Sequence, residues 1–322
     1  MTAYKEIQGI SVQTVAGDPP APLEGQIWYN SSTGTFRVNE GPLVTAWATG
    51  NDMNTARRVF GDAGTQTAAL GFGGFPTGVQ AKTESYNGTN WTEVNDLNTG
   101  RYNLAGAGVQ TSALAFGAGF SDGQTETYDG TNWTEVNDLN NGRVNLAGVG
   151  ADNTAVLAIG GSPPSPIAAF TESWNGTNWT EVNDLNTARE RLAAAGIQTA
   201  ALAFGGYANP PILIAALTES WNGTSWTEVN DLNTQKRELG GAGTQTSALA
   251  FGGNIPPNTG TTESWNGTNW TEVNDLNTVR EQLSGAGSNN TSALAFGGNI
   301  PPETGATEEW GETGGTKTIT EV

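Results

Sequence analysis

Glutamates recur at equivalent points of this 322-residue chain, and a pair of carboxylates is the usual machinery of glycoside hydrolysis. A hydrolase needs an acid and a base whose environments separate their pKa values, whereas repeated copies receive similar environments. The chain has no Cys and no His, which removes thiolate nucleophiles and the commonest general base. We therefore predict a non-enzymatic protein with no catalytic residues and no cofactor. The two series are Glu84, Glu126, Glu172, Glu219, Glu263 and Glu308, and Glu93, Glu135, Glu181, Glu228 and Glu272.

A basic residue also recurs once per repeat, and an aspartate precedes each one by five residues. The basic series is Arg57, Arg101, Arg143, Arg189, Lys236 and Arg280, and the acidic series is Asp52, Asp96, Asp138, Asp184, Asp231 and Asp275. One interpretation is a rim that binds an anion. The other is a structural ring, in which each basic residue forms an ion pair with its aspartate. We favour the structural ring, because a repeated residue usually serves the repeated scaffold.

The charge of the chain disfavours two classes of partner. Lys plus Arg number 13 and Asp plus Glu number 32, which gives a net charge of −19. Such a chain is repelled by nucleic acid and by anionic membrane surfaces. No apolar run approaches the ~20 residues of a membrane span, and residues 1–20 lack the apolar core of a signal peptide. Asp and Asn residues in loops are possible calcium ligands. No EF-hand-like ligand series is present, however, so we predict no metal site.

The elements that position these residues belong to a repeat. Its marker is a tryptophan with spacings of 44, 42, 46, 47 and 44 residues, at Trp47, Trp91, Trp133, Trp179, Trp226 and Trp270. The unit has short runs at 179–182, 192–196, 200–204 and 218–221, separated by turn residues. This pattern predicts four short strands per unit and no helix. The Asn-Gly turn at 222–223 places Trp221 opposite Trp226 as an aromatic pair.

An alternating apolar run, a double glycine, an aromatic residue, a Trp and then an Arg together resemble the kelch motif of β-propellers. The double glycine stands at 73–74, 160–161, 205–206, 252–253 and 297–298, whereas the second unit has glycine at 117 and 119. The resemblance covers about 44–310 and implies an all-β, six-bladed kelch-like β-propeller with a small N-terminal β-hairpin extension. We expect the propeller to span 44–322 and the strand at 44–49 to close its last blade. The segment 317–322 is the alternative closing strand. Small residues should line the axis, where bulky side chains would collide.

Residues 1–43 lie outside the repeat and form the expected anchoring segment. Residues 17–22 read as a stiff Pro-rich spacer, and residues 25–38 as a hairpin. A lone hairpin cannot bury Trp28, Tyr29 and Phe36, so we expect these residues to dock on a partner. The Gly-Gln-Ile-Trp-Tyr-Asn run at 25–30, followed by kelch-like units, resembles structural proteins of tailed bacteriophages.

The loops after each double glycine vary in length and sequence, and individual function in repeat proteins tends to lie in such segments. We expect these loops to share a face with the Asp-to-Arg connections. Two of them are apolar, and they are either a partner-binding surface or longer strands that pack on the next blade. The residues concerned are Pro163, Pro164, Ile167, Phe170, Tyr207, Pro210, Pro211, Ile212 and Ile214.

These features favour a virion structural protein of a tailed phage, in a tail fibre, spike or capsid decoration. Its expected partners are other virion proteins and a host surface glycan or protein, and it should be present in several copies. The alternative is a carbohydrate-binding propeller lectin, in which the repeated aromatic residues offer stacking faces. Burial separates the two hypotheses, because a lectin needs exposed aromatic residues on one face.

Overall fold

The structure is a computed structural model that describes residues 12–39, 44–76, 78–117, 123–163, 166–211, 213–313 and 316–318. The chain divides into two compact units. The larger unit is Trp47–Gly311, and the smaller unit combines Met1–Ala46 with Glu312–Val322. The described residues are all-β, with strands and turns and no helix.

Repeated four-stranded antiparallel sheets make up the larger unit, and we number them in chain order as the first to the sixth sheet. The first three are β5 (Gly61–Thr65), β6 (Ala68–Phe72), β7 (Thr83–Tyr86) and β8 (Trp91–Val94); β9 (Ala105–Val109), β10 (Ser112–Phe116), β11 (Thr125–Tyr128) and β12 (Trp133–Val136); and β13 (Ala147–Asp152), β14 (Ala155–Ile159), β15 (Thr171–Trp174) and β16 (Trp179–Val182).

The fourth and fifth sheets repeat the same order. They are β18 (Ala193–Ile197), β19 (Ala200–Phe204), β21 (Thr218–Trp221) and β22 (Trp226–Glu228); and β23 (Gly240–Thr244), β24 (Ser247–Phe251), β25 (Thr262–Trp265) and β26 (Trp270–Val273). A separate two-stranded pair joins β17 (Arg189–Glu190) to β20 (Tyr207–Ala208). The sixth sheet takes its strands from both ends of the repeat: β27 (Ser284–Asn289), β28 (Ser292–Phe296), β29 (Thr307–Thr313) and β4 (Val44–Thr49).

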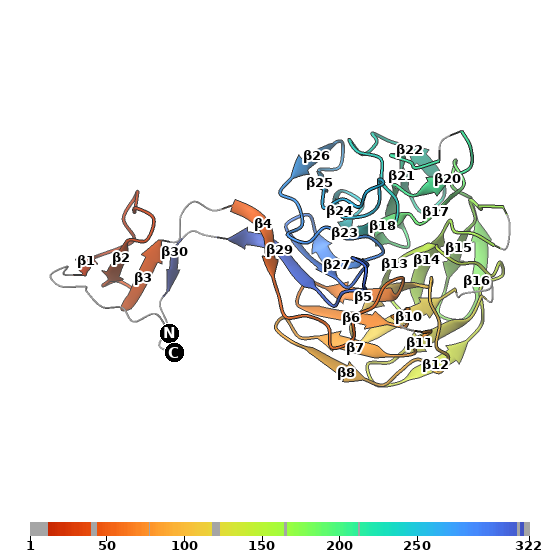
Figure 1. Ribbon diagram of the computed structural model, residues 1–322, viewed down its shortest axis with the longest axis horizontal. Helices are drawn as coiled ribbons and strands as arrows, with labels where there is room; N and C mark the ends of the chain where they lie inside the picture. The colour runs from red at the N-terminus through yellow and green to blue at the C-terminus, as the bar shows by residue number, and fades with distance from the viewer. Residues whose placement is uncertain are drawn as a thin grey trace. The chain divides into compact units, whose positions relative to one another are not determined.

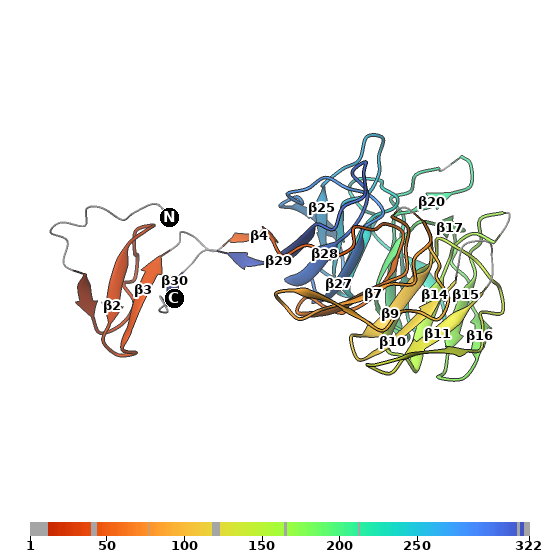
Figure 2. The same ribbon diagram turned by 60° about the horizontal axis from the view of Figure 1, so that its bottom comes forward.

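The first strands of successive sheets lie side by side around a common centre (Figures 1 and 2). The strands β5, β9, β13, β18, β23 and β27 each contact the next, and β27 contacts β5. The sheets themselves stay separate rather than merging into one barrel. This arrangement fits a β-propeller.

The strand predicted at 44–49 is present as β4, beside β29 in the sixth sheet. Its Trp47 is buried against Trp310, with ring centroids 5.4 Å apart. The C-terminal segment differs from the expectation that the larger domain continues to 322. Residues from Glu312 onward group with the smaller unit, because β30 (Thr316–Thr318) pairs with β3 (Thr35–Asn39). The end of the alternative closing segment, residues 319–322, lies outside the described residues.

The cores of the larger unit lie between neighbouring sheets. One cluster joins Leu114 and Phe116 of the second sheet to Val156, Trp174 and Trp179 of the third. The predicted aromatic pair is present there, because the rings of Trp174 and Trp179 are 5.3 Å apart and both residues are buried. Burial of such faces between sheets is the main source of stability in stacked repeats.

The innermost strands are rich in Gly and Ala, as predicted, because neighbouring backbones approach closely. A Cβ added to Gly106 would lie 2.2 Å from the backbone oxygen of Asp62 on the adjoining strand. No side chain fits that gap, so the spacing of the inner strands depends on glycine at this position.

The smaller unit is a four-stranded sheet in the order β1 (Gln13–Val15), β2 (Ile27–Asn30), β3 and β30. The expectation of a lone hairpin is therefore wrong. Trp28, expected to dock on a partner, is fully buried and donates a hydrogen bond to Asp18 Oδ1 at 3.1 Å. The expected Pro-rich spacer supplies that aspartate, and the Pro22 carbonyl accepts from the Asn39 amide at 2.7 Å. The segment therefore folds back onto the sheet instead of extending as a spacer.

Candidate functional site

The repeated basic residues are buried, and their partners are the repeated glutamates rather than the aspartates. Arg189 Nη2 lies 3.0 Å from Glu219 Oε1, and Arg143 pairs with Glu172 in the same way. The remaining pairs are Arg57–Glu84, Arg101–Glu126, Lys236–Glu263 and Arg280–Glu308. These side chains are at most 3% exposed, so they form no rim that an anion can reach. Burial lowers the pKa of each basic group, and the paired carboxylate opposes that shift.

The predicted Asp–Arg ion pair fails because the two residues point to different sheets. Asp184 Oδ1 accepts a hydrogen bond from the Thr171 backbone N–H of the third sheet at 3.0 Å. Arg189, five residues later, reaches Glu219 in the fourth sheet. The same glutamate accepts from the backbone N–H and side-chain amide of Asn186, at 2.7 and 2.8 Å. The first glutamate series is thus saturated by the scaffold and offers no free carboxylate pair.

The variable loops do share a face with the Asp-to-Arg connections. In the five units that have a double glycine, the residue after the basic position pairs with the residue after the second glycine, as Arg58 with Phe75 and Arg237 with Asn254. Among the predicted partner-binding residues, Pro210 and Pro211 are exposed. Half-buried positions are Pro163, Ile167, Phe170, Tyr207 and Ile214, and Pro164 and Ile212 lie outside the described residues. Tyr207 forms a bridge with Ile214, so this loop is partly ordered by its own backbone.

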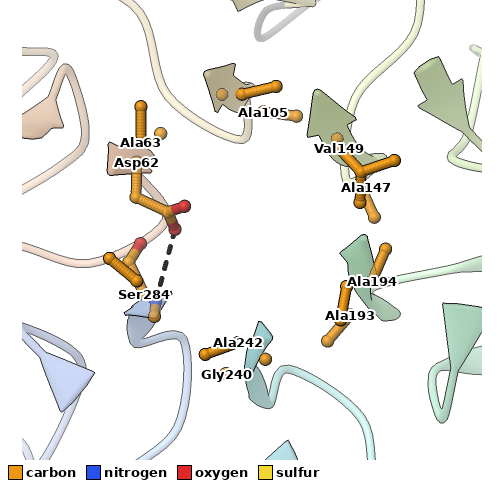
Figure 3. A pocket seen from close by; sticks show the side chains of 18 of the residues that line it. Asp62, Ala63, Ala105, Ala147, Val149, Ala193, Ala194, Gly240, Ala242 and Ser284 are labelled. Carbon is orange, nitrogen blue, oxygen red and sulfur yellow. Dashed lines mark hydrogen bonds between the residues drawn. The ribbon is translucent and has the colours of Figure 1, made fainter. Parts of the chain in front are cut away.

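A channel runs along the centre of the larger unit and contains a cavity of about 230 Å³ lined by the innermost strands (Figure 3). Almost every lining residue is Gly, Ala or another apolar residue. The exceptions are Ser284 and Asp62, and Asp62 is the single acidic residue in this lining. At the equivalent position the other sheets carry Gly106, Gly148, Ala194, Gly241 and Gly285.

Asp62 lies beside the sixth sheet, where its Oδ2 accepts from the Gly285 backbone N–H at 3.4 Å (Figure 3). Burial inside the channel raises the pKa of Asp62 to about 7, although hydrogen bonds from Ser284 and Gly285 act in the opposite direction. Our sequence analysis missed this residue. The signal was present, since an acidic residue replaces the small residue that every other repeat has at this point.

A second cavity, of about 380 Å³, opens at the end of the channel that carries the variable loops. We call it the mouth cavity. Six of its lining residues occupy equivalent positions, two residues after each basic position, and all have backbone φ between 51° and 57°. They are Val59, Asn103, Asn145, Arg191, Glu238 and Gln282.

The same six residues form a ring of backbone hydrogen bonds around the mouth. Each N–H donates to the carbonyl of its counterpart in the preceding sheet, as from Asn103 to Val59 at 2.8 Å. The bond from Val59 to the Gln282 carbonyl, at 3.3 Å, joins the first sheet to the sixth. The mouth cavity therefore has a rigid frame whose side chains differ from one sheet to the next. Sequence analysis did not single out these positions, because left-handed backbone geometry is hard to foresee at residues other than glycine.

No protein-family model and no curated protein matches the chain. Within the described ranges, no helix is long and apolar enough to cross a membrane, and no group of three or more Asp or Glu is placed to hold a metal ion.

Proposed function

We propose that this chain is a non-enzymatic structural protein of a tailed-phage virion, in which the smaller unit anchors a six-bladed kelch-like propeller to the particle. The observation that carries the proposal is a partly exposed apolar face in the described part of the smaller unit. The kelch-like motifs and the phage-like run at 25–30 support the same assignment. We place the chain in several copies in the virion, against other virion proteins.

The apolar face follows from the register of β2 and β3. Tyr29 lies opposite Phe36 and Ile27 opposite Val38, so these four side chains share one side of the sheet. Ile27 is 42% exposed and Phe36 is 47% exposed. Large apolar side chains gathered on one face of a small sheet are typical of an interface.

Trp28 points to the opposite side of the sheet, where it is fully buried and donates a hydrogen bond to Asp18. It therefore stabilises the smaller unit, and Phe36 with Ile27 supplies the anchoring contact. Tyr29 supports this contact, because its ring centroid lies 5.1 Å from that of Phe36.

The larger unit supplies a rigid display scaffold. Its repeated basic residues and the first glutamate series are held in buried ion pairs, and its tryptophans are no more than 5% exposed. The tryptophans therefore offer no stacking faces, which the free-lectin alternative requires. The end of the channel with its variable loops is accessible, and we assign host-surface recognition to that end.

The test is the protein content of purified particles, measured by mass spectrometry. We expect Phe36→Glu to reduce incorporation by more than about tenfold, because a charge at the centre of an apolar contact costs over ~2 kcal/mol. Thr33→Glu, in the exposed hairpin turn, is the matched control and should incorporate normally. Wild-type particles that lack the chain, or normal incorporation of Phe36→Glu, would refute the proposal.

A further inference from the structure

We propose that the mouth cavity is a binding site for the ring of a neutral saccharide. This inference deepens the proposed display role, and it rests on that role only for the source of the saccharide, a glycan of the host surface. The volume of about 380 Å³ falls within the range of small-ligand pockets.

The six residues of the backbone ring carry side chains although their left-handed backbone conformation favours glycine. Among residues other than glycine, the cost of left-handed φ is smallest for asparagine, as at Asn103 and Asn145, and largest for a β-branched residue such as Val59. The chain contains 45 glycines and has none at these six positions. Strained residues of this kind cluster at ligand sites, where the side chain is needed for its own sake.

The cavity is apolar beneath and polar around its edge. The six residues that follow the ring residues line both the mouth cavity and the channel cavity, and each is at most 7% exposed: Phe60, Leu104, Leu146, Leu192, Leu239 and Leu283. Above this floor stand three amides, Asn103, Asn145 and Gln282, with Tyr102 at the side. A pyranose ring has the matching form, since its faces carry C–H groups and its edge carries hydroxyls that both donate and accept.

The state of the amides fits a ligand with hydroxyl groups. Gln282 Oε1 accepts from Arg58 at 3.0 Å, and Asn145 Nδ2 donates to Glu190 at 3.0 Å, so each amide is held in place with a second polar atom remaining. The side-chain amide of the half-buried Asn103 has no hydrogen bond to any residue in the described part of the chain, although its backbone N–H donates to Val59. A hydroxyl can serve either atom of an amide, which neither a carboxylate nor an ammonium group can do.

The charges around the cavity indicate that the ligand is neutral. Arg58 Nε lies 3.1 Å from Glu303, and Arg191 pairs with Glu238. Burial raises the pKa of the neighbouring Glu281, and the nearby Glu238 raises it further. An anion would meet these carboxyl groups, and a cation would compete with arginines already in place. A neutral polar ligand disturbs none of the pairs.

The experiment uses the full chain and the methyl glycosides of neutral hexoses and N-acetylhexosamines, followed by saturation-transfer NMR and titration calorimetry. The key variant is Asn103→Gly. Glycine relieves the left-handed backbone, so the melting temperature should stay the same or rise, while affinity falls about tenfold for the lost amide contacts. Gln282→Gly should behave similarly. Thr246→Ala, at the opposite end of the channel, is the control and should bind as wild type.

Saccharide binding that is lost in the glycine variants at unchanged stability would support the site. Absence of binding to every neutral glycoside at millimolar concentration, or equal binding by wild type and Asn103→Gly, would overturn it. Preference for a charged glycan or for a peptide would overturn the ligand class. Incorporation of the chain into particles is measured separately, so failure here is distinguishable from failure of the anchoring proposal.

Discussion

At the scale of single residues, one carboxyl group breaks the repeat. Asp62 faces the channel where the other sheets have Gly or Ala, and it contacts the backbone N–H of Gly285. This contact joins the first sheet to the sixth, so Asp62 replaces apolar packing by a polar link at that junction. The Asp62 carboxyl group loses part of its hydration in forming this link, because the channel wall surrounds it.

This environment predicts a specific pH dependence. The pKa of Asp62 in the folded chain, about 7, exceeds its ordinary value of 3.8. Between these values the folded state binds the proton and the unfolded state does not, so stability falls as pH rises through this window. We expect Asp62→Asn to match the wild type at pH 4 and to melt on the order of 5 °C higher at pH 8, because ~2 kcal/mol shifts Tm by roughly that amount.

Thermal melts monitored by circular dichroism at several pH values would measure this difference. Asp129→Asn is a matched control, since four other hairpin turns carry Asn at that position. The pKa of Asp129 is lowered by hydrogen bonds from the backbone N–H groups of Asn132 and Thr131. Replacing Asp129 by Asn should therefore not raise the melting temperature by an amount that increases with pH. A pH-independent difference for Asp62→Asn would show that the carboxyl group is fully solvated.

At the scale of elements, each sheet is tied to its neighbour through the tryptophan of its outer strand. Trp179 of β16 donates to Thr125 Oγ1 of β11 at 3.1 Å, and Trp226 of β22 donates to Thr171 of β15 at the same distance. A glutamine at the inner hairpin turn adds a second tie. Gln198 donates to Ser173 Oγ at 3.0 Å in the preceding sheet. The ties lie at both the outer and the inner strands, so each pair of sheets is held in one orientation.

These contacts predict that two substitutions of Trp179 reduce the free energy of unfolding by different amounts. Trp179→Phe keeps the aromatic packing and loses the bond to Thr125, which should reduce the free energy of unfolding by about 1–2 kcal/mol. Trp179→Ala also empties the space beside Trp174 and should cost about 3–5 kcal/mol. Urea unfolding followed by circular dichroism measures both. Equal effects of the two variants would mean that the indole N–H, rather than packing, determines the stability of this junction.

The sequence predicted these elements well where spacing is strict. The run at 179–182 is β16, the Trp pair is in place, and the small residues line the channel. It failed where a side chain can point to either of two sheets. Asp184 and Arg189 are close in sequence, yet one bonds the sheet before and the other the sheet after. It also failed where the chain folds back, as when Asp18 covers Trp28. The mouth cavity depends on backbone angles that residue types other than glycine do not reveal.

At the scale of the whole molecule, the sixth sheet is completed by a strand from the other end of the repeat, and this strand also joins the sixth sheet to the fifth. Trp47 of β4 donates to Thr262 Oγ1 at 3.0 Å, as the other tryptophans do to their neighbours. Its carbonyl accepts from the Asn277 side chain at 2.9 Å. In an array whose units are stabilised by their neighbours, loss of one junction weakens all of them.

Two shortened chains would test this dependence. Residues 44–313 retain β4 and should melt cooperatively near the temperature of the full chain. Residues 50–313 lack β4 and therefore lack Trp47. In the full chain the ring centroids of Trp47 and Phe251 are 4.9 Å apart, and this packing is lost. Since the lost contacts include a buried tryptophan, we expect a drop of over ~3 kcal/mol in unfolding free energy, together with a loss of near-ultraviolet circular dichroism. A synthetic peptide of residues 44–50 should restore part of the signal. Equal melting of the two chains would mean that the larger unit holds together without its N-terminal strand.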